Sequence, residues 1–178
     1  MTRFDTNEKY PTLFAPIDNA RVRAQFTLLE VMPPEDLIGN VYLVPRVKED
    51  WLYLIEANGR YQFPGGKKDP GENHLETIRR ELMEEAGARL HDFQIIGAWH
   101  SHMKDEKPLL PHLPHPESYA LVGTSQVEVV GPPTNPEGAG QTLEVHIDEL
   151  NNVVNTFQSN NRPDLADLYE LTSDIIAK

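Results

Sequence analysis

The segment at residues 73–86 has the clearest helical periodicity in this 178-residue chain, and strand-like segments flank it. Its apolar residues recur at three- and four-residue spacing and form one stripe: Leu75, Ile78, Leu82 and Ala86. Asn73 is expected to cap the first turn with Glu76 reaching back, and Gly87 to end the helix in a left-handed conformation. A helix with one apolar face must pack that face against another layer, so we expect a sheet beneath it.

Runs rich in Val, Leu, Tyr and Trp supply that sheet. Strands are predicted at 23–32, 40–47, 51–56, 93–102, 118–130 and 142–147, and amphipathic helices at 148–157 and 163–176. This order of elements predicts an α/β protein with a mixed sheet covered by helices on both faces. Residues 1–22, with Pro11 and Pro16, are predicted to form an extended arm, and residues 23–178 a single domain of ordinary size.

Composition excludes several classes of function. The chain carries 28 Asp plus Glu against 16 Lys plus Arg, a formal charge of −12, which disfavours binding to polymeric nucleic acid. The absence of cysteine excludes thiol catalysis, disulfides and cysteine-ligated zinc. There is no apolar run of about 18 residues and no signal-peptide pattern, so we expect a cytoplasmic protein that does not insert into a membrane.

Three carboxylates lie close together on the predicted helix, an arrangement that is unfavourable in an isolated helix. Glu81, Glu84 and Glu85 lie at i, i+3 and i+4, on one solvent-side face opposite the apolar stripe. Like charges within one turn repel, and acids near a helix C-terminus oppose its dipole. Hard divalent cations such as Mg²⁺ would make the arrangement favourable, because they take oxygen ligands and bridge to phosphates. The plain alternative is a solvated acidic face.

The loop before the helix favours the metal interpretation. It runs Gly-Gly-Lys-Lys-Asp-Pro-Gly-Glu over residues 65–72, and its glycines let the backbone approach a ligand closely. Residues 66–88 together resemble the signature of the Nudix hydrolase family: Gly, five residues, Glu, seven residues, then Arg-Glu-apolar-x-Glu-Glu-x-Gly-apolar. All seven fixed letters are matched, by Gly66, Glu72, Arg80, Glu81, Glu84, Glu85 and Gly87.

The resemblance implies a fold and an activity. The fold is the Nudix α/β/α sandwich with a mixed central β-sheet. The activity is metal-dependent hydrolysis of a pyrophosphate bond in a nucleoside diphosphate linked to another moiety, by water attack at phosphorus with Mg²⁺ or Mn²⁺. An ADP-ribose-like compound or a nucleotide sugar is the expected substrate, and a homodimer formed through the N-terminal arm is the expected assembly.

The resemblance also assigns roles to residues in the motif. Glu81, Glu84 and Glu85 would bind the metal, with the carbonyl oxygen of Gly65 as a further ligand. Arg80 would orient Glu81 through a forked ion pair. Glu72 would assist through a coordinated water or through the loop. Substrate contacts are expected from the loop and from a downstream strand, at Gly66, Lys67 and Tyr119.

Candidates outside the motif rest on weaker patterns. A downstream acid often completes such sites, and Glu137 in the Pro-Thr-Asn-Pro-Glu-Gly loop is our candidate, with Glu117, Glu128 and Glu144 as competitors. The segment 100–116 holds four histidines whose spacing matches no familiar zinc pattern. A loop that lines the substrate cleft is the better interpretation of that segment.

Two other functions stay open at the level of sequence. A Nudix-fold module could bind a nucleotide without turnover, although such modules usually have an eroded motif, and this motif is intact. An acidic cation-binding protein without nucleotide chemistry would leave the glycine loop and Arg80 unexplained.

Overall fold

The computed structural model describes residues 3–134 and 143–177. Its helices are α1 (Arg3–Lys9), α2 (His74–Ala86), α3 (Leu150–Ser159) and α4 (Pro163–Ile176), with a 3-10 helix, η1, at Glu35–Leu37. Its strands are β1 (Ile17–Asp18), β2 (Val22–Leu28), β3 (Ile38–Val47), β4 (Asp50–Glu56), β5 (Tyr61–Gln62), β6 (Gly65–Lys67), β7 (Ala88–Leu90), β8 (Gln94–Met103), β9 (Glu117–Val129) and β10 (Leu143–Asp148).

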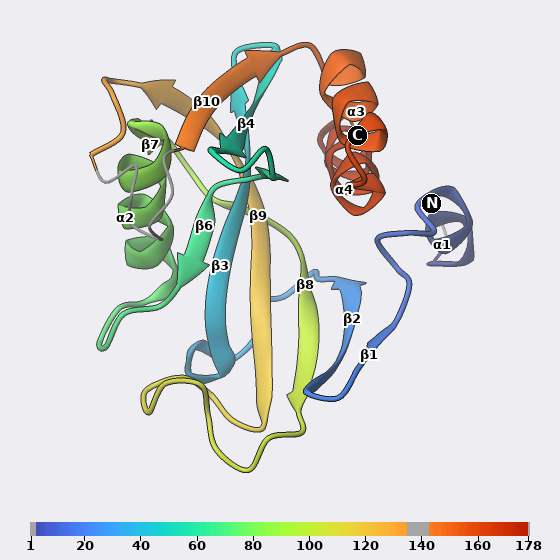
Figure 1. Cartoon of the computed structure of the whole chain (residues 1–178), viewed down its shortest axis with the longest axis vertical. Coiled ribbons are helices and arrows are strands. Elements are labelled where there is room, and N and C mark those ends of the chain that lie inside the picture. The colour runs from blue at the N-terminus through green and yellow to red at the C-terminus, as the bar shows by residue number, and fades with distance from the viewer. Residues whose placement is uncertain (1–2, 135–142, 178) are drawn as a thin grey trace.

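The central sheet is mixed. Its main path runs β1-β2-β8-β9-β3-β4-β10, and the long β3 and β9 strands pair in parallel whereas the other pairs along the path are antiparallel. Helix α2 lies on one side of the sheet, and α3 and α4 lie on the other (Figure 1). The predicted α/β/α sandwich is confirmed, and each predicted long strand and helix is present within a few residues. The largest difference is at β2, which ends four residues before the predicted limit.

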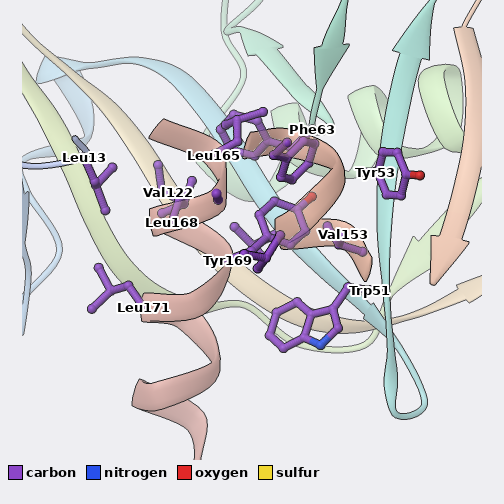
Figure 2. Packing of buried hydrophobic residues seen from close by; sticks show 14 of the residues in the cluster. Leu13, Trp51, Tyr53, Phe63, Val122, Val153, Leu165, Leu168, Tyr169 and Leu171 are labelled. Carbon is purple, nitrogen blue, oxygen red and sulfur yellow. The ribbon is translucent and has the colours of Figure 1, made fainter. Parts of the chain in front are cut away.

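Two hydrophobic cores fill the two spaces between the layers. The core beneath α2 contains the predicted stripe residues Ile78, Leu82 and Ala86, all at most 1% exposed. The core on the other side is aromatic and joins the sheet to α3 and α4 (Figure 2). In that core the Tyr169 hydroxyl donates to the carbonyl of Leu52, so a buried polar group is paired. The sheet is therefore fixed from both faces, which gives α2 a rigid support.

The N-terminal segment differs from the prediction. The prediction of an extended arm over residues 1–22 is wrong for Arg3–Lys9, which form α1. Tyr10 and Leu13, immediately after it, are at most 2% exposed. The Tyr10 hydroxyl donates to Asp174 of α4, and the Leu13 amide donates to Asp167 of the same helix. A short segment has no periodicity that a sequence shows, and its contacts with α4 determine its structure.

Short strands place the glycine-rich loop. β5 pairs with β4, and β6 pairs antiparallel with β3, so that Gly66 lies opposite Val41. β6 leads directly into the loop that precedes α2. The loop glycines and the start of α2 are consequently held against the middle of the sheet.

Candidate active site

Helix α2 begins and ends as its sequence predicts. The Asn73 side chain accepts hydrogen bonds from the amides of Leu75 and Glu76, and the Glu76 carboxylate accepts one from the Asn73 amide. Gly87 ends the helix with φ 59°, a left-handed conformation that glycine adopts at little cost. Fixed ends and a buried stripe leave the rotation of α2 fully determined.

The three carboxylates share one face, and that face is only partly exposed to solvent. Glu81, Glu84 and Glu85 line a cavity of about 470 Å³ between α2, the glycine-rich loop and β3. The side chain of Glu81 is only 13% exposed and that of Glu84 31%. The prediction of a shared face is confirmed, and its description as a solvent-side face is corrected. We call this cavity the carboxylate pocket.

Glycines at 65 and 66 make this close approach possible. A Cβ atom on Gly66 would lie 2.3 Å from Oε1 of Glu81, far inside van der Waals contact. Gly65 has φ 141°, and a Cβ there would lie 2.3 Å from the Val41 carbonyl oxygen. The Gly65 amide donates to Oε2 of Glu85 at 3.0 Å. A side chain at Gly66 would push the loop away from Glu81, and one at Gly65 would push the loop away from β3.

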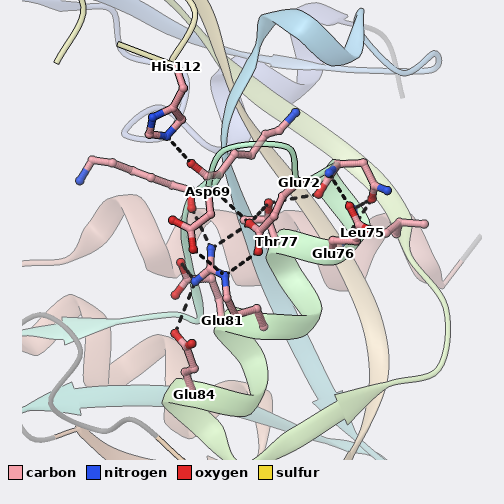
Figure 3. A network of polar contacts seen from close by, with 12 residues as sticks. Asp69, Glu72, Leu75, Glu76, Thr77, Glu81, Glu84 and His112 are labelled. Carbon is pink, nitrogen blue, oxygen red and sulfur yellow. Dashed lines mark hydrogen bonds and ion pairs between the residues drawn. The ribbon is translucent and has the colours of Figure 1, made fainter. Parts of the chain in front are cut away.

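Arg80 forms its forked ion pair with a different partner from the predicted one. Its Nε and Nη2 atoms donate to the two carboxylate oxygens of Glu72, at 2.7 and 3.0 Å. Nη1 makes single contacts, at 2.9 Å to Glu81 and 3.4 Å to Glu84 (Figure 3). Nη2 also donates to the carbonyl of Lys67. Arg80 therefore ties the loop to α2 through Glu72, and it contacts the carboxylates through one nitrogen.

The electrostatics of the pocket differ along the helix. Hydrogen bonds from Arg80 are the main cause that lowers the pKa of Glu72 to about 2. Burial raises the pKa of Glu85 to about 8, despite the hydrogen bond from Gly65, and the charges of Glu81 and Glu84 raise it further. Burial also raises the pKa of Glu81. The carboxylate pocket thus disfavours the ionised forms of Glu81 and Glu85, which a cation bound there would favour.

The donor set of the pocket fits a hard divalent cation. Carboxylate oxygens on one side and the backbone of the glycine-rich loop on the other are the ligand types that Mg²⁺ and Mn²⁺ take. Within residues 3–134 and 143–177, no three histidine or carboxylate side chains already converge as a metal-binding cluster. Arg80 supplies the positive charge between Glu81 and Glu84 in this state, so a cation would have to compete with its Nη1 atom.

The family model of the NUDIX domain matches residues 29–167 of the chain, which include strands β3 to β10, helix α2 and the residues of the carboxylate pocket. The chain belongs to the NUDIX family.

Curated relatives cover only part of this NUDIX chain. A Bacillus subtilis protein, YtkD, to which 8-oxo-dGTP diphosphatase activity is attributed, is 34% identical over 67 residues, 38% of this chain and 42% of YtkD. An RNA pyrophosphohydrolase of Francisella philomiragia is 33% identical over 72 residues, 39% of this chain and 46% of that protein. The chain thus matches less than half the length of either relative.

Solved structures confirm the NUDIX fold. A point mutant of the B. subtilis pyrophosphohydrolase BsRppH superposes with a TM-score of 0.55 at 19% identity, over 74% of this chain and 77% of that one. The MutT protein of Methanosarcina mazei Go1 superposes with a TM-score of 0.53 at 20% identity, over 79% and 96% of the two chains. At these identities the likeness concerns the fold.

Of the other predicted site residues of the NUDIX chain, only some lie at the carboxylate pocket. Lys67 lines the carboxylate pocket, whereas Tyr119 does not line it and instead stacks on His100, with ring centroids 4.6 Å apart. Glu117 pairs with His100 and His102, at 2.6 Å each. Glu137 lies outside the described residues. Of the predicted set, the structure brings the motif residues and Lys67 together and leaves Tyr119 elsewhere on the sheet.

The histidine- and proline-rich segment reaches the pocket at two points. The His112 Nε2 atom contacts the carbonyl of Lys68 in the glycine-rich loop at 2.9 Å (Figure 3), and Leu110 lines the carboxylate pocket. The segment therefore forms part of the cleft wall, in line with the cleft-lining interpretation.

Three residues that the sequence does not single out also line the pocket. Tyr42 lies on β3, Glu56 ends β4, and Arg60 follows the turn at Gly59. Burial, with smaller contributions from Glu85 and Glu81, raises the pKa of Tyr42. The sequence signal that could have identified Glu56 and Arg60 is their position, because residues 56–60 form the turn immediately before the glycine-rich lead-in.

Proposed function

We propose that this NUDIX domain hydrolyses a pyrophosphate bond in a nucleoside diphosphate linked to another moiety, with Mg²⁺ or Mn²⁺. One observation carries the proposal: three α2 carboxyl groups face a cavity beside the glycine-rich loop, and burial raises the pKa of two of them, Glu81 and Glu85. A bound cation would favour the ionised forms of these groups and would bridge them to a polyanionic substrate.

Glu81, Glu84, Glu85 and the carbonyl oxygen of Gly65 would hold the cation. When bound, the cation neutralises charge on the phosphoryl oxygens and makes water a better nucleophile. In the free enzyme at neutral pH Glu85 retains a proton, because its pKa is about 8, so loading the site releases that proton.

The remaining residues position the reacting groups. Arg80 holds Glu72 and the loop carbonyl of Lys67 together and keeps Glu81 turned into the pocket. Because Gly66 has no side chain, the Glu81 carboxylate can lie directly against the loop backbone. The Lys67 ammonium lines the pocket and attracts phosphate. Each of these roles binds or orients substrate, and together they account for the residues of the motif.

The substrate class has two candidates. An ADP-ribose-like compound or a nucleotide sugar is our first choice, on the resemblance stated above. The partial matches to an 8-oxo-dGTP diphosphatase and an RNA pyrophosphohydrolase favour a nucleoside triphosphate or a 5′-triphosphate end as the second. The acidic surface supports a small nucleotide over a nucleic-acid polymer.

A substrate panel tests the function. Purified protein with Mg²⁺ would be incubated with ADP-ribose, nucleotide sugars, dinucleoside polyphosphates, nucleoside triphosphates and 5′-triphosphorylated RNA, beside Glu85→Gln and the control Glu49→Gln, whose side chain lies exposed between β3 and β4. We expect turnover that needs the metal and falls roughly 100-fold or more in Glu85→Gln alone. Nucleotide binding without turnover across the panel would favour the binding module.

Location and assembly are further proposals. In the described residues no helix is long and apolar enough to span a bilayer. We propose a cytoplasmic protein that acts on a small-molecule nucleotide. The residues after α1 pack on α4 of the same chain, so a homodimer formed through the N-terminal segment would use the faces of that segment that point away from α4.

A further inference from the structure

A second cavity adjoins the carboxylate pocket. It has a volume of about 370 Å³ and lies on the side of the sheet that faces α4, above Trp99 of β8 and Ala120 of β9. Tyr42, Arg60 and Gln62 line both cavities, so these three residues lie at the boundary between them. None of the motif residues lines the second cavity, which we call the aromatic pocket.

The walls of the aromatic pocket are rigid and flat. Phe63 stacks on Tyr42 with ring centroids 5.2 Å apart and planes 29° apart. The Trp99 indole packs edge-on against Phe26 at 5.0 Å, which fixes the plane that it offers to the cavity. Leu165 of α4 closes the far side next to Phe63 (Figure 2). Such walls favour a planar aromatic guest over a sugar or a free phosphate.

Two polar side chains of the aromatic pocket have unused hydrogen-bonding capacity. The Gln62 amide and the Ser101 hydroxyl both line it, and neither makes a side-chain hydrogen bond to another described residue. Together they offer donors and acceptors at the edge of an aromatic space. A nucleobase combines a flat aromatic body with an edge of donors and acceptors, and so matches both properties of the cavity.

Arg60 is a cationic residue at the boundary between the carboxylate pocket and the aromatic pocket. Four cationic side chains line the carboxylate pocket, and two of them are engaged: Arg80 with Glu72, and Lys68 with Glu35 at 2.6 Å. Arg60 has only a 3.9 Å contact to Glu56, and its side chain is 65% exposed. Lys67 is the other uncommitted cation, but it lines only the carboxylate pocket. A phosphate at the boundary between the pockets would therefore meet Arg60.

We propose that the aromatic pocket holds the nucleobase of the substrate and that Arg60 binds the phosphate next to the nucleoside. The substrate is then a nucleoside 5′-phosphate derivative of at least two phosphates, with the base over Trp99 and the scissile bond over the α2 carboxylates. This assignment rests on the proposed function, and it adds the orientation of the substrate and a residue that selects for it.

Ligand binding without turnover tests the assignment first. Trp99 lines the pocket whereas Trp51 is 4% exposed in the core, so tryptophan fluorescence of the full chain reports on this cavity. The probes are AMP, GMP, CMP and UMP, against ribose 5-phosphate, which carries the same phosphate without a base. We expect at least one nucleotide to change the fluorescence and ribose 5-phosphate to leave it unchanged. Equal responses to all five probes would overturn the assignment of the base.

Variants at the junction test Arg60. We expect Arg60→Ala to weaken nucleotide binding about tenfold and to raise KM with kcat nearly unchanged, because it removes a charged hydrogen bond made before and during reaction. Arg60→Lys should recover part of the affinity. The control Arg23→Ala, on an exposed arginine of β2 outside both pockets, should bind like the parent. Identical Kd and KM in Arg60→Ala and the parent would overturn the role of Arg60.

A pocket-filling variant separates this inference from the proposed function. Ser101→Leu places a larger apolar side chain in the aromatic pocket and is expected to abolish the fluorescence response, with circular dichroism confirming the fold. If the parent turns over nucleotides and Ser101→Leu has the same KM, the inference is wrong and the proposed function stands. If no substrate is turned over but nucleotide binding depends on Arg60 and Ser101, the pocket assignment stands and the hydrolase proposal fails.

Discussion

The two ends of helix α2 use the same residue type for opposite purposes. Immediately before the first turn, Glu72 accepts hydrogen bonds from the Arg80 fork and from Thr77, and its pKa is lowered to about 2. Near the last turn burial raises the pKa of Glu85 to about 8, with the Gly65 amide as its compensating donor. The paired carboxylate of Glu72 stabilises the fold, whereas ionising the buried Glu85 carboxyl group costs free energy that a bound cation would offset.

Removing the residue that joins the two ends should have the largest effect. Arg80→Ala would leave Glu72 and Glu81 without their cation and free the loop carbonyl of Lys67. We expect the free energy of unfolding in urea to fall by about 3 kcal/mol, because a mostly buried ion pair is broken. Turnover should fall about 100-fold. Its neighbour Arg79, exposed on α2, provides the control: if Arg79→Ala costs as much, the network is not the cause.

Low pH should remove the stabilisation that the ionised Glu72 carboxylate provides. Folding lowers the pKa of Glu72 from near 4.5 to about 2, so its stabilisation is present above pH 4.5 and is lost as the pH falls towards 2. We expect Glu72→Gln to cost about 2 kcal/mol at pH 7 and almost nothing at pH 2. Urea unfolding across that range measures the difference. A cost that does not depend on pH would show that shape, not charge, is what Glu72 contributes.

At Glu85 the dependence of stability on pH has the opposite sign. Folding raises the pKa of Glu85 from near 4.5 to about 8, so the folded state binds more protons and stability falls as the pH rises through that window. Metal-free Glu85→Gln should therefore melt about 4 °C above the parent at pH 8.5 and at the same temperature near pH 4. Added Mg²⁺ should raise the melting temperature of the parent and have much less effect on the variant. Equal Mg²⁺ shifts in both proteins would contradict metal binding at Glu85.

The cap should have the smallest effect. Asn73→Ala removes the acceptor for the amides of Leu75 and Glu76, and we expect a loss of about 1 kcal/mol in unfolding free energy. The kcat value should not change, because the cap does not contact the carboxylate pocket. Asn151→Ala, at an exposed position in α3, is the control and should unfold like the parent. A large loss of kcat in Asn73→Ala would show that the two ends are coupled.

Features set by local spacing could be predicted well. The capping box, the glycine end and the apolar stripe of α2 all depend on residues within one or two turns. The two ends are confirmed, and of the four stripe residues Ile78, Leu82 and Ala86 are buried whereas Leu75 is only partly buried. The partner of the Arg80 fork could not be predicted in this way. Glu72 and Glu81 both lie within reach of Arg80, and the choice between them depends on how β6 holds the loop against β3.

Contacts between distant segments account for the remaining differences. The structure of residues 3–13 depends on aspartates of α4 that lie more than 150 positions away. Arg60 belongs to no motif, and it becomes a candidate because β4, β5 and β8 place it between two cavities. Tyr119 lies on a predicted strand, but its register opposite His100 places it outside the carboxylate pocket.

The sequence by itself determined the helix, its ends, the spacing of its carboxylates and the family, because these are properties of neighbouring residues. Only the tertiary structure decided that the carboxylates face a cavity, that two of them are shielded enough to have raised pKa values, and that an aromatic pocket adjoins them. Burial and charge compensation depend on every segment that packs around a group, and spacing along one helix does not contain that information.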